Sequence, residues 1–302
     1  MAIDVLTPVP KTQEERWDYL KAGADLIMLG EELSFTQYQE LFVEAHNYCT
    51  WTPSSEEGDD TDRTAEQKES INPQEDLYSK LQDYFGPYYF EASRKQAEAL
   101  HNEDLLKYYS SRWTSYSNGA GSLNRLFNYL YRSYIKVQAR DGGRKDLYPV
   151  FQLALRSWRE HFLSPLQQHG RKLTRALIQL AERHREGETI DIGLMDSVLS
   201  SLVSVGIDTE NMFFLSLDAY KEHFETEFLR ESEERYRKAS ETWRSGSDEH
   251  VQAAKARVQE ENDYISAAGE YLRPETQEEL RRRCEVTILG DLAGEPGKGT
   301  TQ

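Results

Sequence analysis

The chain has 302 residues, a formal net charge of −17, 29% charged residues and 38% hydrophobic residues. This acidity argues against a nucleic-acid backbone as the main partner, because phosphate contacts require clustered Lys and Arg. No stretch approaches the roughly 18 apolar residues of a membrane span, and the first residues lack the basic start and apolar run of a secretory signal. We therefore expect neither nucleic acid nor membrane as a partner. The low hydrophobic content favours an all-helical protein with much surface for its core.

Two cysteines, Cys49 and Cys284, lie far apart in the sequence and form no CxxC pattern. This spacing predicts neither a disulfide framework nor a zinc site. Reduced thiols are the ordinary state in the cytoplasm and nucleus, and we expect the protein in those compartments.

The first predicted helix begins at Thr12 with a T-x-x-E capping box. The Thr12 hydroxyl accepts from the Glu15 amide, and the Glu15 carboxylate accepts from the Thr12 amide. Apolar residues then recur at helical spacing as far as Met28, and Gly30 ends the helix. The next helix, 34–48, opens with the same device.

The helix over 34–48 carries two apolar stripes where a surface helix needs one. The stripe at i, i+4 and i+7 predicts the core-facing side and comprises Leu41, Ala45 and Tyr48. Tyr38 and Phe42 form a second pair at i, i+4, rotated away from the first stripe. Two interpretations stay open. Either the second stripe docks another protein, or neighbouring helices of the same chain bury both stripes.

Residues 52–72 hold one apolar side chain of any size, Ile71, and we expect a disordered acidic loop there. A third helix follows and bends or ends near Pro87. A fourth helix is expected over about 102–116, with the sequence NGAG at 118–121 as its break. A fifth, over 122–138, is apolar almost all round, which places it in a core or between a core and a partner.

A turn over 139–146 closes this five-helix block, and a second helical block begins at Leu147. Its helices are expected over roughly 147–162, 165–185, 191–205, 209–243 and 249–271. The clearest apolar stripe in this block comprises Leu194, Val198, Leu202 and Val205. With no period-two alternation, two such blocks predict an all-α, elongated solenoid of five-helix repeats without a sheet.

The C-terminal segment 276–289 starts with another T-x-x-E pattern, Thr276 and Glu279, and then gives way to GDLAGEPGKGTTQ. A helix that dissolves into Gly and Pro suggests a truncated chain. GEPGKGTTQ fails the spacing of a phosphate loop, and neither the strand nor the helix that should flank such a loop is present.

The motifs contain no catalytic constellation. The seven His residues have no H-x-x-x-H or HExxH spacing, and there is no G-x-S-x-G elbow and no Cys with a placed His. We therefore assign no catalytic, cofactor-binding or metal-binding residue and expect a protein that is not an enzyme. The segment 125–175 is basic; we favour solvated helix faces there, with an acidic partner as the alternative.

Several segments resemble the cullin family, especially the class that scaffolds SCF ubiquitin ligases. The run YQELFVEAHNYCT at 38–50 is similar to the family pattern Y-x-x-L-Y-x-x-x-Y-N-Y-C-T. The likeness extends to LLKYYSSRWTSY, YLYRSYIKVQARDGGRKDLYPVFQLALRSWREHFLSPL, GETIDIGLMDSVLSSLVSVGID, YKEHFETEFLRESEERY and YLRPETQEELRRRCE. It covers nearly the whole chain apart from the acidic loop and the last dozen residues.

This resemblance implies a non-catalytic scaffold in ubiquitin-dependent protein catabolism, built from cullin repeats of five helices each. It implies that the second and fifth helices of repeat one bind a Skp-type adaptor that holds an F-box receptor. The cullin-exchange factor is a further candidate partner. The matching adaptor-binding positions are Tyr38, Gln39, Phe42, Ala45, His46, Leu126, Tyr129, Leu130, Arg132 and Ser133.

The resemblance also suggests how the chain divides. We expect a flexible N-terminus over 1–11, repeat one over 12–140 with its disordered loop at 52–73, repeat two over 141–289 with an incomplete last helix, and a disordered tail over 290–302.

The sequence departs from the family pattern in two ways. Gln39 stands where the family often has Met, and His46 where it has Tyr, which weakens the affinity or shifts the adaptor preference. The third repeat and the C-terminal half, which bind the RING-box protein and carry the modified lysine, have no counterpart here. We expect no RING-box binding and a chain that competes with the complete scaffold. The alternative is a helical-repeat module with another partner.

Overall fold

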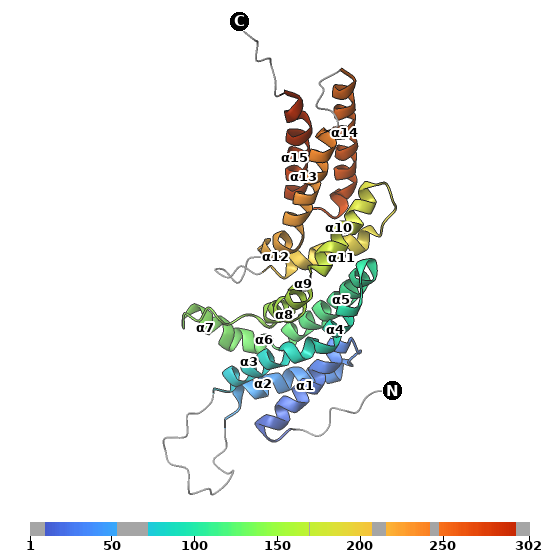
Figure 1. Cartoon of the computed structure of the whole chain (residues 1–302). Helices are drawn as coiled ribbons and strands as arrows, with labels where there is room; N and C mark the ends of the chain where they lie inside the picture. The colour runs from blue at the N-terminus through green and yellow to red at the C-terminus, as the bar shows by residue number, and fades with distance from the viewer. Residues whose placement is uncertain (1–9, 53–71, 169, 207–215, 242–247, 294–302) are drawn as a thin grey trace. The chain divides into compact units, whose positions relative to one another are not determined.

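The computed structural model describes residues 10–52, 72–168, 170–206, 216–241 and 248–293. Every regular element in these residues is a helix, so the all-α prediction is confirmed (Figure 1). The helices form two compact units. Unit 1 comprises residues 1–94 and 111–163, and unit 2 comprises 95–110 and 164–302.

The N-terminal helices of unit 1 begin and end as their capping residues predict. In α1 (Gln13–Leu29) the capping box of Thr12 and Glu15 is present, and Gly30 ends the helix in the left-handed conformation with φ 78°. In α2 (Phe35–Thr50) the Ser34 hydroxyl and the Gln37 side chain form the second box. These predictions hold because each device involves only residues within one helical turn.

The remaining elements of unit 1 include short irregular helical pieces. They are α3 (Pro73–Tyr84), α4 (Pro87–Ala99, shared with unit 2), α5 (Asn102–Leu126, shared with unit 2), α6 (Asn128–Leu130), the π-helical η2 (Tyr131–Ile135), α7 (Lys136–Arg140), α8 (Val150–Trp158) and the π-helical η3 (Arg159–Leu163). The predicted end of the third helix near Pro87 is confirmed.

The predicted break at 118–121 is wrong, because α5 runs through it without interruption. A Cβ at Gly119 would lie 2.7 Å from Met28 Sδ and 3.1 Å from Met28 Cα, so the missing side chain lets α5 approach α1 closely. Glycine costs a helix about 1 kcal/mol relative to alanine. Here tertiary contact outweighs that local cost.

An aromatic cluster fills the core of unit 1 around Trp158. The ring of Trp158 lies 5.0 Å from Tyr116, 4.4 Å from Phe162 and 5.9 Å from Phe90, measured between centroids. The Tyr116 hydroxyl is buried and donates to the Ala154 carbonyl at 2.8 Å. Burial of this cluster joins α4, the second half of α5, α8 and η3 into one core.

The two glycines of α5 provide a matched test of this packing. We expect Gly119→Ala to lower the midpoint of urea unfolding, because the overpacking cost of about 1–3 kcal/mol exceeds the gain in helix propensity. Gly121→Ala should raise the midpoint, since nothing lies within 4 Å of a Cβ there and only the propensity gain of about 0.5–1 kcal/mol remains. Equal shifts for both variants would contradict the close approach.

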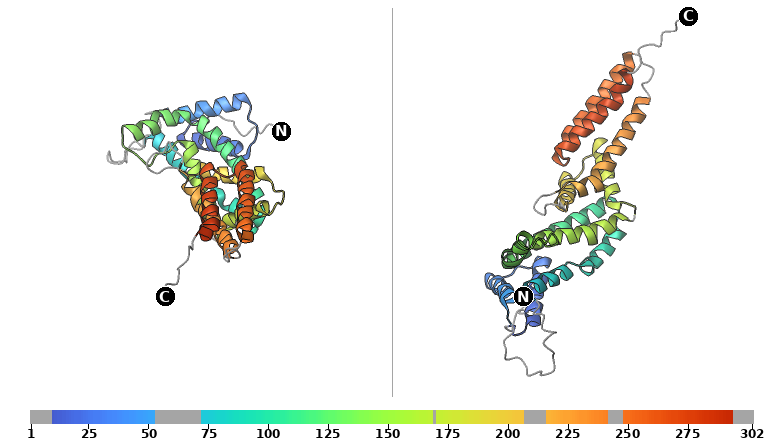
Figure 2. Two further views of the ribbon diagram at one scale, coloured as in Figure 1. Left: turned by 90° about the horizontal axis from the view of Figure 1, so that it is seen from above. Right: turned by 90° about the vertical axis from the view of Figure 1, so that its left-hand side faces the viewer.

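Unit 2 contains the helices of the second half of the chain. They are α9 (Ser164–Gln168), α10 (Lys172–Arg185), α11 (Ile192–Ser204), α12 (Asp218–Tyr220), the π-helical η4 (Lys221–Glu225), α13 (Thr226–Glu241), α14 (Asp248–Ala267), the 3-10 element η5 (Ala268–Glu270) and α15 (Pro274–Ala293). Figure 1 and the right-hand view of Figure 2 show α15 running beside α13 and α14, in agreement with its contacts to both. The predicted stripe on α11 is buried.

The predicted capping box at Thr276 and Glu279 is wrong. The helix α15 begins earlier, at Pro274. Thr276 is buried, and its hydroxyl donates to the Glu225 carboxylate at 2.6 Å and lies 3.0 Å from the Tyr220 hydroxyl. The sequence spacing predicts that the Thr276 hydroxyl caps a helix, but in the structure this hydroxyl forms a contact between helices.

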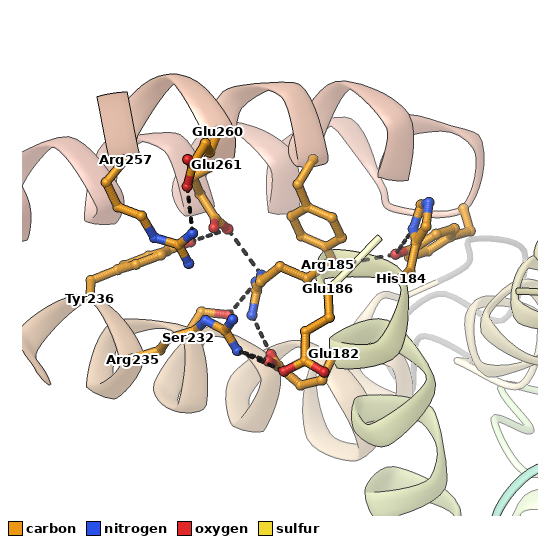
Figure 3. Close-up of polar contacts among 12 residues, drawn as sticks. Glu182, His184, Arg185, Glu186, Ser232, Arg235, Tyr236, Arg257, Glu260 and Glu261 are labelled. Atoms are coloured by element: carbon orange, nitrogen blue, oxygen red, sulfur yellow. Dashed lines mark hydrogen bonds and ion pairs between the residues drawn. The ribbon is translucent and has the colours of Figure 1, made fainter. Parts of the chain in front are cut away.

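A buried ion pair lies where α10 meets α13 and α14 (Figure 3). Arg185 Nε lies 3.1 Å from Glu261 Oε1, and the two side chains are 2% and 1% exposed. The Tyr236 hydroxyl donates to the same Glu261 oxygen at 2.6 Å, and Arg185 Nη2 donates to Ser232 at 2.9 Å. Glu182 binds Arg185 as well. Burial and the nearby Glu261 charge raise the pKa of Tyr236 well above its usual range, so its hydroxyl stays a donor.

Neutralising Glu261 should destabilise unit 2. Glu261→Gln removes the more deeply buried of the two carboxylates that pair with the buried Arg185 charge, at a cost of about 3–5 kcal/mol. Its neighbour Glu260 pairs with Arg257 at the surface, so Glu260→Gln should cost less than about 1 kcal/mol. Chemical denaturation followed by circular dichroism distinguishes the two variants, and similar small losses for both would show that the buried pair contributes little.

Both cysteines are buried and free. Burial raises the pKa of the Cys49 thiol and of the Cys284 thiol to about 12, which leaves both protonated at neutral pH. In the part of the chain that the structure describes, no helix is long and apolar enough to cross a membrane.

The predicted division of the chain stays a prediction. The compact units separate after Leu163 and not after Arg140, but a compact unit and a sequence repeat are different divisions. The flexible N-terminus, the acidic loop at 52–73 and the tail at 290–302 fall almost entirely outside the described residues.

Candidate protein-docking site

The helix α2 is held in unit 1 by its predicted inner stripe. Leu41, Ala45 and Tyr48 are all buried, and α2 contacts α1, α3 and α6 (Figure 1). A Cβ at Gly23 of α1 would overlap the Leu41 side chain, so Leu41 of α2 packs directly against the α1 backbone at this glycine. The Tyr48 hydroxyl donates to the Asp76 carboxylate of α3. These contacts fix the rotation of α2 about its own axis.

A largely buried ion pair reinforces this rotation. The Arg16 guanidinium of α1 binds the Glu44 carboxylate of α2, with side chains that are mostly removed from solvent. Glu44 also accepts from the Asn47 amide at 3.2 Å. Because Glu44 lies beside the inner stripe, its pairing to α1 leaves the opposite face of α2 turned outward.

The outer face of α2 concentrates exposed apolar surface. Seven large hydrophobic side chains are exposed in the part of the chain that the structure describes, and three of them lie on this helix. Their exposed fractions are 77% for Phe35, 42% for Phe42 and 54% for Val43. Exposed apolar residues scattered singly are ordinary, whereas several on one helix face indicate a binding surface.

The predicted α2 residues surround this apolar surface. Gln39 and His46 are exposed, and Tyr38 is half-buried. The His46 ring packs edge-on against Tyr129, with 4.4 Å between the centroids. The contact brings the fifth predicted helix next to α2. The exposed face of unit 1 that comprises Tyr38, Gln39, Phe42, His46 and Tyr129, together with Phe35 and Val43, is the candidate docking face, named the docking face below.

Two of the predicted residues, Arg132 and Ser133, lie in η2. Ser133 accepts from the Gln74 amide of α3 at 3.1 Å and donates to the Tyr129 carbonyl at 2.8 Å, so its hydroxyl is occupied within unit 1. Arg132 is exposed. A single π turn inserts one extra residue into the helix and rotates the residues after it, a feature often found at functional sites. Ser133 therefore supports Tyr129, while Arg132 remains available at the edge.

The structure buries three of the predicted adaptor-contact residues in the core. Ala45 is 2% exposed, Leu126 is 0% exposed and Leu130 is 1% exposed. Ala45 belongs to the inner stripe that packs on the neighbouring helices, and the two leucines point inward from their own helices. An apolar side chain without exposed surface cannot contact a partner unless the unit opens.

Phe35 and Val43 were missed by the sequence reasoning. Phe35 lies at the very start of α2, where it reads as a helix-start residue. A signal was nevertheless present, because Phe35, Gln39, Phe42 and His46 recur at i, i+4, i+7 and i+11 and so share one helix face. In the part of the chain that the structure describes, no group of three or more His, Cys, Asp or Glu is arranged to hold a metal.

The chain matches the model of a known protein family. Residues 17–294 match the model of the cullin alpha solenoid domain. The chain belongs to the cullin family. Both helices of the docking face lie within the matched range, as do both compact units apart from their ends.

Individual relatives are more distant but extensive. The chain is 27% identical to Cullin-1 of Dictyostelium discoideum over 296 residues, which is 96% of this chain and 37% of that protein. It is 27% identical to Cullin-1 of Schizosaccharomyces pombe over 90% of this chain and 35% of that protein. Cell division control protein 53 of Saccharomyces cerevisiae is 27% identical over 74% of this chain and 28% of that protein. The chain thus spans about a third of the length of these relatives.

Stability measurements should separate the core residues from the docking face. We expect Leu126→Ala to lower the free energy of unfolding by about 2–5 kcal/mol, because it leaves a cavity beneath the surface. Phe42→Ala should cost less than about 1 kcal/mol, since much of the ring is already in water. Urea denaturation of the two variants measures the difference. A loss for Phe42→Ala as large as that for Leu126→Ala would show that the Phe42 side chain is part of the core.

Proposed function

We propose that this chain is a scaffold segment of a cullin–RING ubiquitin ligase of the SCF type, which acts in ubiquitin-dependent protein catabolism. It is not an enzyme itself, and it binds a Skp-type adaptor that carries an F-box receptor. The observation that carries the proposal is the outer face of α2, where Phe35, Phe42 and Val43 are exposed on a helix whose inner stripe is fully buried. Family membership and the similarity to proteins named Cullin-1 support the choice of partner.

Docking would proceed by burial of this face against the adaptor. Phe42 lies at the centre and Tyr38 beside it, and Tyr129 extends the face to the next helix. Aromatic side chains bury a large area with few rotatable bonds, which is why they dominate the affinity of most interfaces. Gln39, His46 and Arg132 surround the centre, where polar side chains exclude water and set the register.

The buried stripe gives the face its rigidity. Since α2 is already fixed by its contacts with three helices, little conformational entropy is lost when the adaptor docks. The same face would serve the cullin-exchange factor as a second, competing partner. We place the complex in the cytoplasm and nucleus, where the reduced, buried thiols are stable.

Binding of a purified Skp-type adaptor loaded with an F-box fragment tests the proposal. We expect saturable one-to-one binding in calorimetry, weakened about 30-fold or more in Tyr38→Ala/Phe42→Ala, because a central hot spot contributes about 2 kcal/mol or more. Circular dichroism should show unchanged helicity in this variant.

Tyr88 offers a matched control, because it is the most exposed aromatic side chain of the described residues and lies on a different helix, α4. Tyr88→Ala should bind as the wild type does. The absence of binding by a chain that is demonstrably folded would refute the proposed function. Equal weakening by both variants would show that the contact is not specific to α2.

A further inference from the structure

A pocket of about 420 Å³ opens beside Tyr38, on the flank of the docking face. Its walls come from the end of α1, the connection between α1 and α2, and the middle of α5. Ile27 and Leu33 supply apolar surface, and Asn118 and Ser122 supply an amide and a hydroxyl. Tyr38 belongs to both the pocket and the docking face, so a partner that covers Tyr38 also covers the mouth of the pocket.

The pocket has an unbalanced charge. Glu31 is the only charged residue among those that line it, and it has no ion-pair partner in the part of the chain that the structure describes. The sequence from 29 to 52 contains four Glu and neither Lys nor Arg. The wall therefore carries one acidic group among apolar and neutral polar side chains.

Such a combination fits one class of side chain. Lys and Arg lay their aliphatic stems along apolar surface while the charged head reaches a polar group. Here the stem would lie against Ile27 and Leu33, and the head would reach the Glu31 carboxylate, with the Asn118 side-chain oxygen as a further acceptor. The Ser122 hydroxyl is already occupied, because it accepts from Arg125 Nη2 at 2.9 Å and donates to the Asn118 carbonyl. A hydrogen bond between two charged groups is about twice as strong as a neutral one.

We propose that this pocket receives a Lys or Arg side chain of the docked adaptor–receptor unit, and that Glu31 is a determinant of partner specificity. The inference rests on the proposed function, since it takes the occupant from the partner that covers Tyr38. Two observations carry it: the continuity of the pocket with the docking face through Tyr38, and the unpaired carboxylate on the wall. Partners without a basic side chain at this position bind more weakly.

Charge reversal at two adjacent glutamates tests the assignment. Glu31 lines the pocket, whereas Glu32 follows it directly, is also exposed, and does not line it. Glu31→Arg and Glu32→Arg change the net charge equally, so long-range electrostatics affect both alike. We expect Glu31→Arg to weaken binding of the Skp-type adaptor with its F-box fragment by tenfold or more, mainly through faster dissociation. Glu32→Arg should change the affinity less than threefold.

Two further measurements keep the outcomes distinct. Glu31→Gln, which keeps the size of the side chain, should give an intermediate loss and guards against misfolding of the reversed variant. If the wild type binds, Tyr38→Ala/Phe42→Ala loses binding, and Glu31→Arg matches Glu32→Arg, the pocket assignment is overturned while the proposed function stands. If the folded wild type does not bind, both fail together. In the partner, replacement of surface Lys and Arg by Glu should identify one change that restores binding to Glu31→Arg.

Discussion

The docking face depends on how α2 is held. One side of this short helix is buried against three neighbours, with no room for a side chain at Gly23 where Leu41 packs. Close packing of this kind allows one rotation of the helix and not a range of rotations. Phe35, Phe42 and Val43 are therefore exposed because burial of the inner stripe turns their side of α2 toward solvent.

The buried polar groups of the two units contribute in different ways. In unit 1, Arg16 with Glu44 and Tyr48 with Asp76 join α2 to the helices on either side. In unit 2, Arg185 and Glu261 are almost fully removed from solvent. Burying a charge pair often gains little stability compared with apolar residues of the same size, but breaking the pair is costly. Each pair thus favours one alignment of its helices over shifted alternatives.

Buried and exposed residues have different roles in the candidate site. Core residues such as Leu126 and Leu130 determine where the helix after α5 lies, and Ser133 anchors the carbonyl of Tyr129. The groups left for a partner are few: aromatic rings on α2 and Tyr129, polar groups around them, and a single carboxylate in the neighbouring pocket. Affinity would then come from the rings on α2 and α6, and selectivity would come from the carboxylate in the connection between α1 and α2.

The sequence by itself determined the local features of this protein. Capping boxes at Thr12 and Ser34, the stop at Gly30 and the inner stripe of α2 depend on contacts within a few residues, which the order of residues specifies directly. Only the tertiary structure decided the features that depend on neighbours distant in sequence. The sequence predicts a helix break at Gly119, but the missing side chain there lets α1 pack closely against α5. The sequence predicts a helix cap at Thr276, but the Thr276 hydroxyl donates to Glu225. Ala45, Leu126 and Leu130 match docking positions but fill the core. The exposure of a side chain is set by the groups that pack over it, and periodicity along one helix specifies a face without specifying which neighbour covers it.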